Sequence, residues 1–424
     1  MIDSKLYTKD SIESLSPLEF TRLRPGVYAG DTTYSTQLLV EIVSNAVDEF
    51  RLGHGNKIEV KIDKDIVSVR DYGQGFIPNS FREDGKTILE AAFSVLNTSG
   101  KYREDGTYEG TSLGSFGIGS KITTFLSHWL NVTTDRDGQY ETVSFIEGVF
   151  DNKRLTGKST QDTGTLVEWQ PSEEFFTNTI VEIDKVKSLF KTISCLCPGL
   201  TIILNDNGKE TVFESKNGLS DLADEAVGKK EIINNRFNMN MADGKNKMDM
   251  ILTYTSNYSS TLVPYVNTGL TEKGPHITQI KTVITREFNK FFKEKKWLKE
   301  KDENLTGEDI QEGMYIVFNI TAPNVSYDAQ VKSTITKIDM KPFAQALADN
   351  LQIWLLNNEK EVKMIADKAI AARKAREAAK KARDIVREGQ KKKKEKVLKF
   401  DSKLADCFSK DREKCEIYIT EGKR

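Results

Sequence analysis

The sequence is poor in residues that cross-link the chain or ligate metals. Its 424 residues include four cysteines and three histidines. Four cysteines are too few for a disulfide framework in a chain this long, and their spacing lacks the C-x₂₋₄-C pairs of a structural zinc site. We therefore expect reduced thiols and surface or packing histidines. These residues are Cys195, Cys197, Cys407, Cys415, His54, His128 and His276.

Long apolar runs and a charge of one sign are also missing. No run approaches the roughly 18 apolar residues of a membrane span, and residues 1–6 lack the apolar segment of a secretory signal. The net charge is −1, so global charge says nothing about partners. Hydrophobic residues make up 38% and charged residues 29%, as in ordinary globular proteins. This length suits two or three domains, and the sequence has no internal repeats.

Hydrophobic periodicity predicts an α+β layout in the first half. Residues 36–52 have helical spacing, and residues 57–63 and 66–71 alternate as strands. A glycine-rich span at 98–119 precedes a predicted helix at 119–130. Further strands are expected at 130–134, 142–149 and 164–168, with the helices against one face of a mixed sheet that closes near residue 215.

The second half of the sequence is also predicted to contain both strands and helices, and it ends in a long basic helix. We expect strands at 248–254 and 314–322, a helix at 279–297, and a helical stretch after Pro342 that breaks near 357–358. Residues 368–399 carry 14 Lys/Arg against 4 Asp/Glu. This excess predicts salt-sensitive contact with nucleic acid, although a solvated, charge-laced helix face is the alternative. Residues 417–424 look like the first strand of a further domain, so we expect a fragment.

The predicted helix at 36–52 carries two residues suited to ATP hydrolysis. Glu41 can act as general base on a water, and Asn45, one turn later, can offer a neutral oxygen to Mg²⁺. Asp48 and Glu49 share their polar edge. The alternative is a solvated edge of an amphipathic helix.

Two glycine-containing segments complete a candidate nucleotide site. Asp71 ends a predicted strand and can accept from an adenine amino group, with Gly73 and Gly75 turning the backbone; a plain Asp-x-Gly turn is the alternative. The G-x-x-G-x-G run at 114–119 precedes a helix whose N–H groups can hold phosphates. It is not a dinucleotide-binding fingerprint, and no G-x-x-x-x-G-K-[ST] motif is present. Lys101 can reach a phosphate or remain in solvent.

With these motifs, the chain resembles the ATPase subunit of type IIA DNA topoisomerases, namely gyrase B, topoisomerase IV B and phage or eukaryotic topoisomerase II. Leu23-Arg-Pro-Gly-Val-Tyr-Ala-Gly30 is close to the family's R-P-G-M-Y-I-G signature. Residues 327–332 (Y-D-A-Q-V-K) resemble its Q-T-K loop, and residues 403–407 and 419–422 resemble the entry to its TOPRIM domain.

The resemblance implies a fold and domain boundaries. The expected class is α+β, with a Bergerat-type (GHKL) ATPase domain and N-terminal dimerisation arm at 1–215. An α/β transducer domain, similar to domain 2 of ribosomal protein S5 and ending in a long helix, is expected at 216–395. Residues 396–424 would be a linker and the start of a truncated TOPRIM domain.

The resemblance also implies residue roles. Glu41 would be the base, Asn45 the Mg²⁺ ligand, and Asp71 the adenine acceptor, supported by Thr165. Lys332 would contact the γ-phosphate from the second domain and act in catalysis. The other residues expected around ATP are Asp48, Gly75, Ile77, Pro78, Ser99, Gly100, Lys101, Tyr108, Gly114, Ser115, Phe116, Gly117, Ile118, Gly119, Ser120, Lys121, Gln330, Val331 and Tyr7. Glu421 would belong to the metal site of a full-length TOPRIM domain.

The implied activity is an ATP-driven gate that closes on DNA. Two chains would bind Mg·ATP, dimerise through their N-terminal arms and trap a duplex for a separate DNA breakage-reunion subunit or domain, in the cytoplasm. Gln74, Phe116 and Val331 depart from the family pattern, as does Glu421-Gly-Lys-Arg. Two alternatives remain: a binding module with a degenerate ATP site, which the intact Glu41 disfavours, and a chaperone- or mismatch-repair-type clamp, which the residues at 403–407 and 419–422 disfavour.

Overall fold

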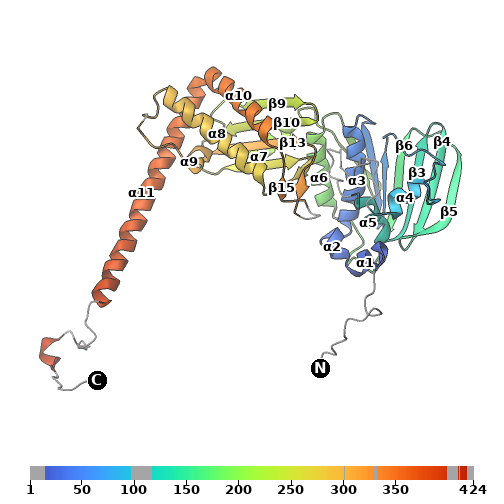
Figure 1. The fold of residues 1–424 in the computed structure, drawn as a ribbon, viewed down its shortest axis with the longest axis horizontal. Coiled ribbons are helices and arrows are strands. Elements are labelled where there is room, and N and C mark those ends of the chain that lie inside the picture. Colours follow the sequence, from blue (N-terminus) through green and yellow to red (C-terminus); the bar gives the residue numbers. More distant parts are fainter. Residues whose placement is uncertain are drawn as a thin grey trace.

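The computed structural model describes residues 15–96, 117–299, 301–328, 332–398, 409 and 411–417. In this part of the chain, two β-sheets lie side by side, and a long helix leads away from the second sheet (Figure 1). No helix of the described residues is long and apolar enough to cross a membrane.

The first sheet has eight strands in the order β5-β4-β3-β6-β2-β1-β7-β8. Its neighbours pair antiparallel except for β1 and β7, which run parallel. Along β1 every second residue is buried, so one face of this strand contacts the core and the other faces outward. The strands are β1 (Lys57–Asp63), β2 (Ile66–Asp71), β3 (Ser127–Arg136), β4 (Gln139–Ile146), β5 (Val149–Lys158), β6 (Gly164–Pro171), β7 (Thr201–Asp206) and β8 (Lys209–Phe213).

Helices pack against the buried face of this sheet and enclose one apolar core. Residues of α3 fill that core with Leu38, Leu39 and Val43, all at most 1% exposed. Helix α3 begins after Ser35 and packs mainly on α5, β1 and β2. The helices are α1 (Pro17–Leu23), α2 (Pro25–Ala29), α3 (Thr36–Arg51), α4 (Ile88–Ser94), α5 (Gly119–Phe125) and α6 (Ile183–Leu196).

Two predicted elements in this half were wrong in extent. The helix expected at 119–130 ends at Phe125, because Ser127–Arg136 alternates between buried and exposed residues as strand β3. The strand expected at 142–149 is divided between β4 and β5, because Glu147 and Gly148 both have positive φ and form the turn of a hairpin.

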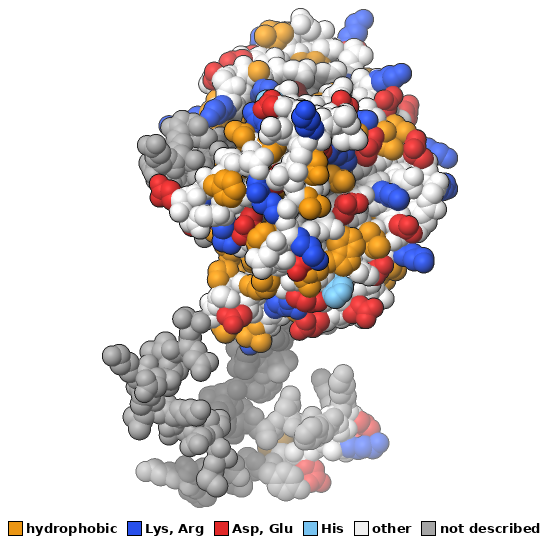
Figure 2. Space-filling view, turned by 90° about the vertical axis from the view of Figure 1, so that its right-hand side faces the viewer, with side chains coloured by type: hydrophobic (Ala, Val, Ile, Leu, Met, Phe, Trp, Pro, Cys, Tyr) orange, Lys and Arg blue, Asp and Glu red, His pale blue; other side chains and the backbone are white. Residues whose placement is uncertain are grey.

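The outer end of the first sheet carries charges of both signs. β5 is its edge strand, and most of its residues are exposed. Figure 2 shows this end of the molecule, with basic, acidic and apolar side chains interspersed. Charged side chains on an exposed edge oppose pairing with another chain.

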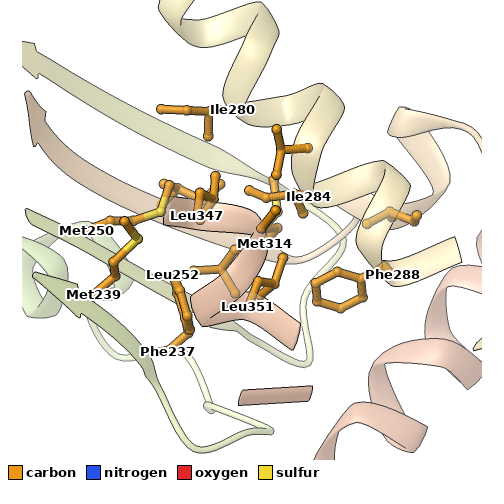
Figure 3. Packing of buried hydrophobic residues seen from close by; sticks show 14 of the residues in the cluster. Phe237, Met239, Met250, Leu252, Ile280, Ile284, Phe288, Met314, Leu347 and Leu351 are labelled. Atoms are coloured by element: carbon orange, nitrogen blue, oxygen red, sulfur yellow. The ribbon is translucent and has the colours of Figure 1, made fainter. Parts of the chain in front are cut away.

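The second sheet has five strands in the order β12-β11-β13-β10-β9, with β11 parallel to β13. Its main core lies between this sheet and helices α8 and α10, where Met250, Ile284, Phe288 and Leu351 meet (Figure 3). The elements are α7 (Leu219–Val227), β9 (Phe237–Asp243), β10 (Asn246–Tyr254), β11 (Thr261–Val266), β12 (Gly269–Leu270), α8 (Pro275–Glu294), α9 (Gly307–Gln311), β13 (Met314–Thr321) and α10 (Lys341–Asn357). The strand pair β14 (Ser326–Tyr327) and β15 (Ile335–Lys337) follows β13.

The last described helix extends away from both sheets. α11 (Glu359–Leu398) begins after a break at Asn358, as predicted, and its first residues Val362, Ile365 and Ala366 are buried in the core of the second sheet. From 377 to 388 its residues are exposed, so the basic side chains of this part face solvent. A short 3₁₀ turn, Arg412–Lys414, is also described.

Helices α6 and α7 join the two halves. A small apolar cluster places Cys195 and Leu196 of α6 against Leu222 and Ala223 of α7 and against Ile251 of β10. The C-terminal end of α3 also reaches the second sheet, because Arg51 Nη2 donates a hydrogen bond to Thr321 Oγ1 at 2.9 Å. The two sheets are thus linked by both apolar packing and a polar contact.

Candidate functional site

The Glu41 carboxylate is held between its own helix and the start of α5. The residue is 8% exposed, and Gln37 Nε2 donates to Glu41 Oε1 at 2.8 Å from one turn earlier. A Cβ atom added at Gly119 would lie 2.2 Å from Glu41 Oε2. Any larger residue at the first position of α5 would therefore push this carboxylate oxygen away from the N-terminal end of that helix.

The other residues of the predicted polar edge of α3 differ in their exposure to solvent. Asn45 is exposed, whereas Asp48 is 3% exposed, and Glu49 is partly buried. Glu49 contacts the turn after β2, because Gln74 N donates to Glu49 Oε2 at 3.3 Å. The solvated-edge alternative is thus wrong for Glu41 and Asp48, since both are removed from water.

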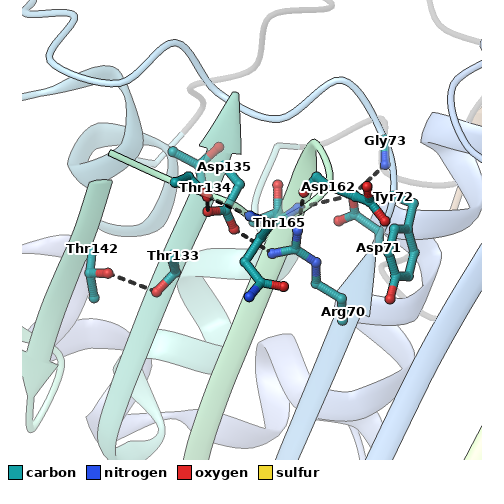
Figure 4. Close-up of polar contacts among 12 residues, drawn as sticks. Arg70, Asp71, Tyr72, Gly73, Thr133, Thr134, Asp135, Thr142, Asp162 and Thr165 are labelled. Carbon is teal, nitrogen blue, oxygen red and sulfur yellow. Dashed lines mark hydrogen bonds and ion pairs between the residues drawn. The ribbon is translucent and has the colours of Figure 1, made fainter. Parts of the chain in front are cut away.

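Asp71 ends β2 and is oriented by two backbone N–H groups. Gly73 N donates to its Oδ1 at 2.8 Å and Thr165 N donates to the same oxygen at 3.2 Å (Figure 4). Burial raises the Asp71 pKa from 3.8 to about 6, aided by the nearby negative charge of Glu49, while the two N–H groups oppose the shift. Perturbed carboxylates of this kind are typical of functional sites.

The turn after Asp71 is packed tightly on the neighbouring strands. Gly75 has φ of +62°, and a Cβ there would lie 2.9 Å from the Asp135 carbonyl oxygen. Phe76 N donates to Thr134 Oγ1 at 2.7 Å, which fixes the next residue against β3. Beyond this turn Ile77 is 52% exposed. An exposed apolar side chain thus follows the turn that holds the Asp71 carboxylate.

The described part of the predicted phosphate segment is residues 117–121. Gly117 has φ of +60°, and Ile118 occupies the position before α5. Ser120 Oγ donates to the Ala92 carbonyl at 2.8 Å, so this hydroxyl is bound to the protein. Lys121 is 3% exposed, and burial lowers its pKa to about 8. Its side chain therefore lies largely inside the protein in this structure. The sequence had predicted that it lines the triphosphate.

Lys332 lies in the second half of the chain, in a strained segment beside β15. Its φ is +59° and it is 9% exposed. The residues after it are fixed, because Glu272 N donates to the Ser333 carbonyl at 2.7 Å and Ile335 N donates to the Lys273 carbonyl at 2.9 Å.

Several predicted site residues lie outside the described part of the chain. They are Tyr7, Ser99, Gly100, Lys101, Tyr108, Gly114, Ser115, Phe116, Gln330, Val331 and Glu421. Among those described, the structure brings Glu41 to Gly119 and Asp71 to Thr165, and it buries Pro78.

Sequence reasoning missed two residues that hold the site together. Gln37 orients Glu41, and its position one turn before the acid was the available signal. Gly73 was expected only to turn the backbone, yet a Cβ there would lie 2.8 Å from Glu49 Cβ. The Asp71 turn therefore packs directly on α3.

The described residues hold no group of three or more His, Cys, Asp or Glu side chains arranged for a metal. A Mg²⁺ ion bound to a nucleotide keeps several waters and phosphate oxygens and needs few protein ligands. The exposed amide of Asn45, one turn from Glu41, fits that limited role.

Comparison with known proteins finds relatives of this chain. The model of the DNA gyrase B family matches residues 218–385. The chain is 33% identical over 430 residues to the B subunit of DNA topoisomerase 4 from Bacillus subtilis, and 34% identical over 429 residues to its counterpart from Staphylococcus aureus. Each match covers 98% of this chain, which spans 64% of the length of either relative.

Solved structures agree with these matches. The 43K ATPase domain of Thermus thermophilus gyrase B, in complex with an aminocoumarin, superposes with a TM-score of 0.68 at 27% identity, covering 87% of this chain and 98% of that one. The topoisomerase IV ATP-binding domain of Francisella tularensis gives 0.69 at 23% identity over 85% and 97% of the two chains, and supports the fold alone. By sequence and fold, the chain is similar to the B subunits of gyrase and topoisomerase IV, and it has the fold of their ATPase part.

Proposed function

We propose that this chain is the ATP-binding and ATP-hydrolysing part of a type II DNA topoisomerase, which dimerises on ATP and closes around a DNA segment. One observation carries the proposal. A single helix, α3, holds the Glu41 carboxylate against the start of α5 and the Glu49 carboxylate against the Asp71 turn. A nucleotide lying along α3 would therefore meet an adenine acceptor at one end and a hydrolytic base at the other.

The adenine end is built around Asp71. Both N–H donors go to Oδ1, which leaves Oδ2 to accept from an exocyclic amino group, directly or through a water. The exposed Ile77 side chain would cover one face of the base, since its burial by a planar ligand removes apolar surface from water. Thr165 supports Asp71 through its backbone N–H group.

The phosphate end is built around Glu41. Gln37 fixes Oε1, so the carboxylate is oriented before a water arrives. The water would attack the γ-phosphorus while its proton passes to Glu41 and the bond to the ADP oxygen breaks. The N–H groups of Gly119 and Ser120, at the start of α5, would face the phosphates, whereas Lys121 N already donates to the Ile118 carbonyl at 3.0 Å. Mg²⁺, bound by Asn45 and phosphate oxygens, would supply positive charge for the triphosphate.

The second sheet would sense the nucleotide through Lys332. This proposal takes residues 1–215 as the ATPase domain with its dimerisation arm, 216–395 as the transducer, and 396–424 as a linker and the start of a TOPRIM domain. The exposed basic part of α11 would contact the duplex without reading its sequence, because its charges pair with phosphates. A breakage-reunion subunit or domain would complete the enzyme.

Size-exclusion chromatography with and without a non-hydrolysable ATP analogue tests the proposal most directly. The analogue should convert monomers to dimers. Glu41→Ala should still bind ATP and dimerise but should lose turnover, because only the proton acceptor is removed. Glu210→Ala, which changes an exposed carboxylate on β8, is the matched control and should behave as the wild type. Retained turnover in Glu41→Ala, or a monomer at saturating analogue, would contradict the proposal.

A further inference from the structure

A row of neighbouring residues crosses the first sheet at the end that carries Asp71. Thr165 of β6, whose N–H group donates to Asp71, pairs with Thr134 of β3 (Figure 4). Thr134 in turn pairs with Glu141 of β4. Paired residues on adjacent strands lie about 5 Å apart on the same face of a sheet. The row therefore leads from the Asp71 carboxylate across the sheet to Glu141.

This row holds a short loop at both of its ends. Phe76 N donates to Thr134 Oγ1 at 2.7 Å, and Asn79 N donates to Glu141 Oε2 at 2.7 Å. Ile77 lies between these two bonds and is 52% exposed. The loop is thus fixed at residues 76 and 79, and it presents an exposed apolar side chain between them.

Arg154 of β5 holds the second of these contacts in place. Its Nε donates to Glu141 Oε1 at 3.1 Å, and its Nη2 donates to the side-chain oxygen of Asn79. The guanidinium carbon also lies 5.0 Å from the centre of the Phe81 ring. The Glu141 side chain is fully buried, and a buried charge that loses its partner is left uncompensated. Arg154 thus both compensates the Glu141 charge and contacts the loop directly.

We propose that Arg154 and Glu141 are positioning residues for nucleotide binding, which fix the loop at 76–79 so that Ile77 lies against one face of the purine base. The proposal rests on the proposed function, because it assumes that the base is bound at Asp71. Both residues act through the loop and not by contact with the nucleotide. A loop that is fixed before the ligand arrives does not have to be ordered by the ligand, so fixing it raises the affinity.

Arg154→Met is the first test, because methionine keeps an unbranched apolar side chain and removes both hydrogen bonds. Isothermal titration with a non-hydrolysable ATP analogue should show affinity reduced roughly tenfold, because the nucleotide itself would then have to order the loop. The KM for ATP should rise by a similar factor while kcat changes much less, since the base end takes no part in breaking the phosphate bond. Wild-type affinity in this variant would overturn the proposal.

A double-mutant cycle with Ile77 separates positioning from a general effect on the fold. Ile77→Ala alone should weaken binding of the analogue, because it removes apolar surface that would cover the base. If Arg154 acts through Ile77, adding Arg154→Met to Ile77→Ala should weaken binding much less than it does in the wild type. Unchanged binding in Ile77→Ala, or two losses of binding free energy that add fully, would show that Arg154 does not act by this route.

Lys153→Met is the matched control. Lys153 is the preceding residue of the same strand, and its exposed ammonium group lies 2.8 Å from an Asp151 carboxylate oxygen. This variant loses one positive charge from β5, as Arg154→Met does, but leaves the loop contacts intact. Its affinity for the analogue should be that of the wild type. An equal loss in both variants would mean that the charge of β5, and not the loop, determines binding.

Asn79→Gly tests the same loop without uncovering the buried Glu141 charge. Glycine readily adopts the φ of +58° found at this position, and its N–H group can still donate to Glu141. Only the contact with Arg154 is removed. The affinity for the analogue should fall roughly threefold, as expected for the loss of one hydrogen bond. Wild-type affinity in a folded Asn79→Gly would contradict the role given to Arg154.

The outcomes separate this inference from the proposed function. If Glu41→Ala abolishes hydrolysis and Asp71→Asn weakens binding, but Arg154→Met binds the analogue as the wild type does, the loop is not what positions the base, and the ATPase assignment is unaffected. If hydrolysis does not depend on Glu41, the proposed function is wrong.

Discussion

Replacing Asp71 by asparagine should stabilise the folded chain and weaken nucleotide binding at the same time. The carboxylate is partly buried at the end of β2, and Gly73 N and Thr165 N both donate to Oδ1. An asparagine can keep these two bonds through its own oxygen. Its Nδ2 group, however, would present a donor where the adenine amino group also donates. Stability and binding should therefore change in opposite directions.

The size of the stability change follows from the shifted pKa. Burial raises the Asp71 pKa from 3.8 to about 6. Because the folded-state value is the higher one, the contribution of Asp71 to stability is greatest at low pH and is lost as pH rises through about 6. At about 1.4 kcal/mol per pKa unit, the cost of keeping the ionised form in the folded chain approaches about 3 kcal/mol at neutral pH. Asparagine does not titrate, so it avoids this cost.

Urea unfolding at two pH values measures this effect. The gain in unfolding free energy from Asp71→Asn should be about 3 kcal/mol at pH 8 and only roughly half of that at pH 5. Isothermal titration with a non-hydrolysable ATP analogue should show loss of affinity in the variant, and in the wild type as pH falls below about 6, since a protonated Asp71 no longer offers the same acceptor. An equal gain at both pH values, or unchanged affinity, would refute the reasoning.

Three further predictions concern the phosphate end, the second sheet and α11. Gly119→Ala should reduce ATP turnover by about 100-fold, because its Cβ would lie 2.2 Å from Glu41 Oε2 and would displace the base, whereas Gly26→Ala, with open space around it, should not; normal turnover in a folded Gly119→Ala would contradict this placement. Lys332→Ala should lower kcat by about 100-fold while exposed Lys337→Ala on β15 should not, and equal rates would mean that Lys332 does not sense phosphate. Duplex DNA should stimulate hydrolysis, and the stimulation should fall steeply between low and high salt; a salt-independent effect would leave the basic part of α11 a structural element.

Local pattern was sufficient where an element has one clear period and sharp ends. The predicted strands at 57–63 and 66–71 coincide with β1 and β2, because every second residue of β1 and both Val67 and Val69 of β2 are buried, and Lys64, with φ of +60°, turns the chain between them. The break between α10 and α11 was also predicted correctly at the Asn357-Asn358 pair. Local sequence specifies such elements before any tertiary contact forms.

The hydrophobic pattern could not locate the boundary where a helix is followed directly by a strand with no polar residues between them. The helix predicted to reach residue 130 merges into a run that becomes β3, and only pairing of β3 with β4 and β6 decides where the helix ends. Helix α6 was not predicted, and only the first residue of the edge strand β5 fell within a predicted strand. The outward side chains of β5 are exposed, so they give no alternation of buried and exposed residues to detect.

For the candidate site too, the sequence predicted some features and could not predict others. Residue types and the family resemblance identified Glu41 and Asp71, but the sequence could not show that Gln37 holds one and that Glu49 packs beside the other. It also could not show that Lys121 is buried. These facts depend on contacts between segments far apart in the chain, which no local period encodes.

Helix α3 explains why hydrolysis should depend on the second sheet. Its 16 residues form one continuous helix of about 24 Å, with its apolar face buried in the first core. Gln37, Glu41 and Arg51 are therefore fixed relative to one another, because a packed helix moves as a body and cannot absorb a displacement the way a loop can. Any shift of β13 that pulls on Arg51 through Thr321 must move the helix as a whole, or break that bond. Since Glu41 lies against Gly119 at the start of α5, a small movement of α3 relative to α5 changes the alignment of the base. Coupling between the sheets thus requires no chain of intermediate side chains beyond the helix itself.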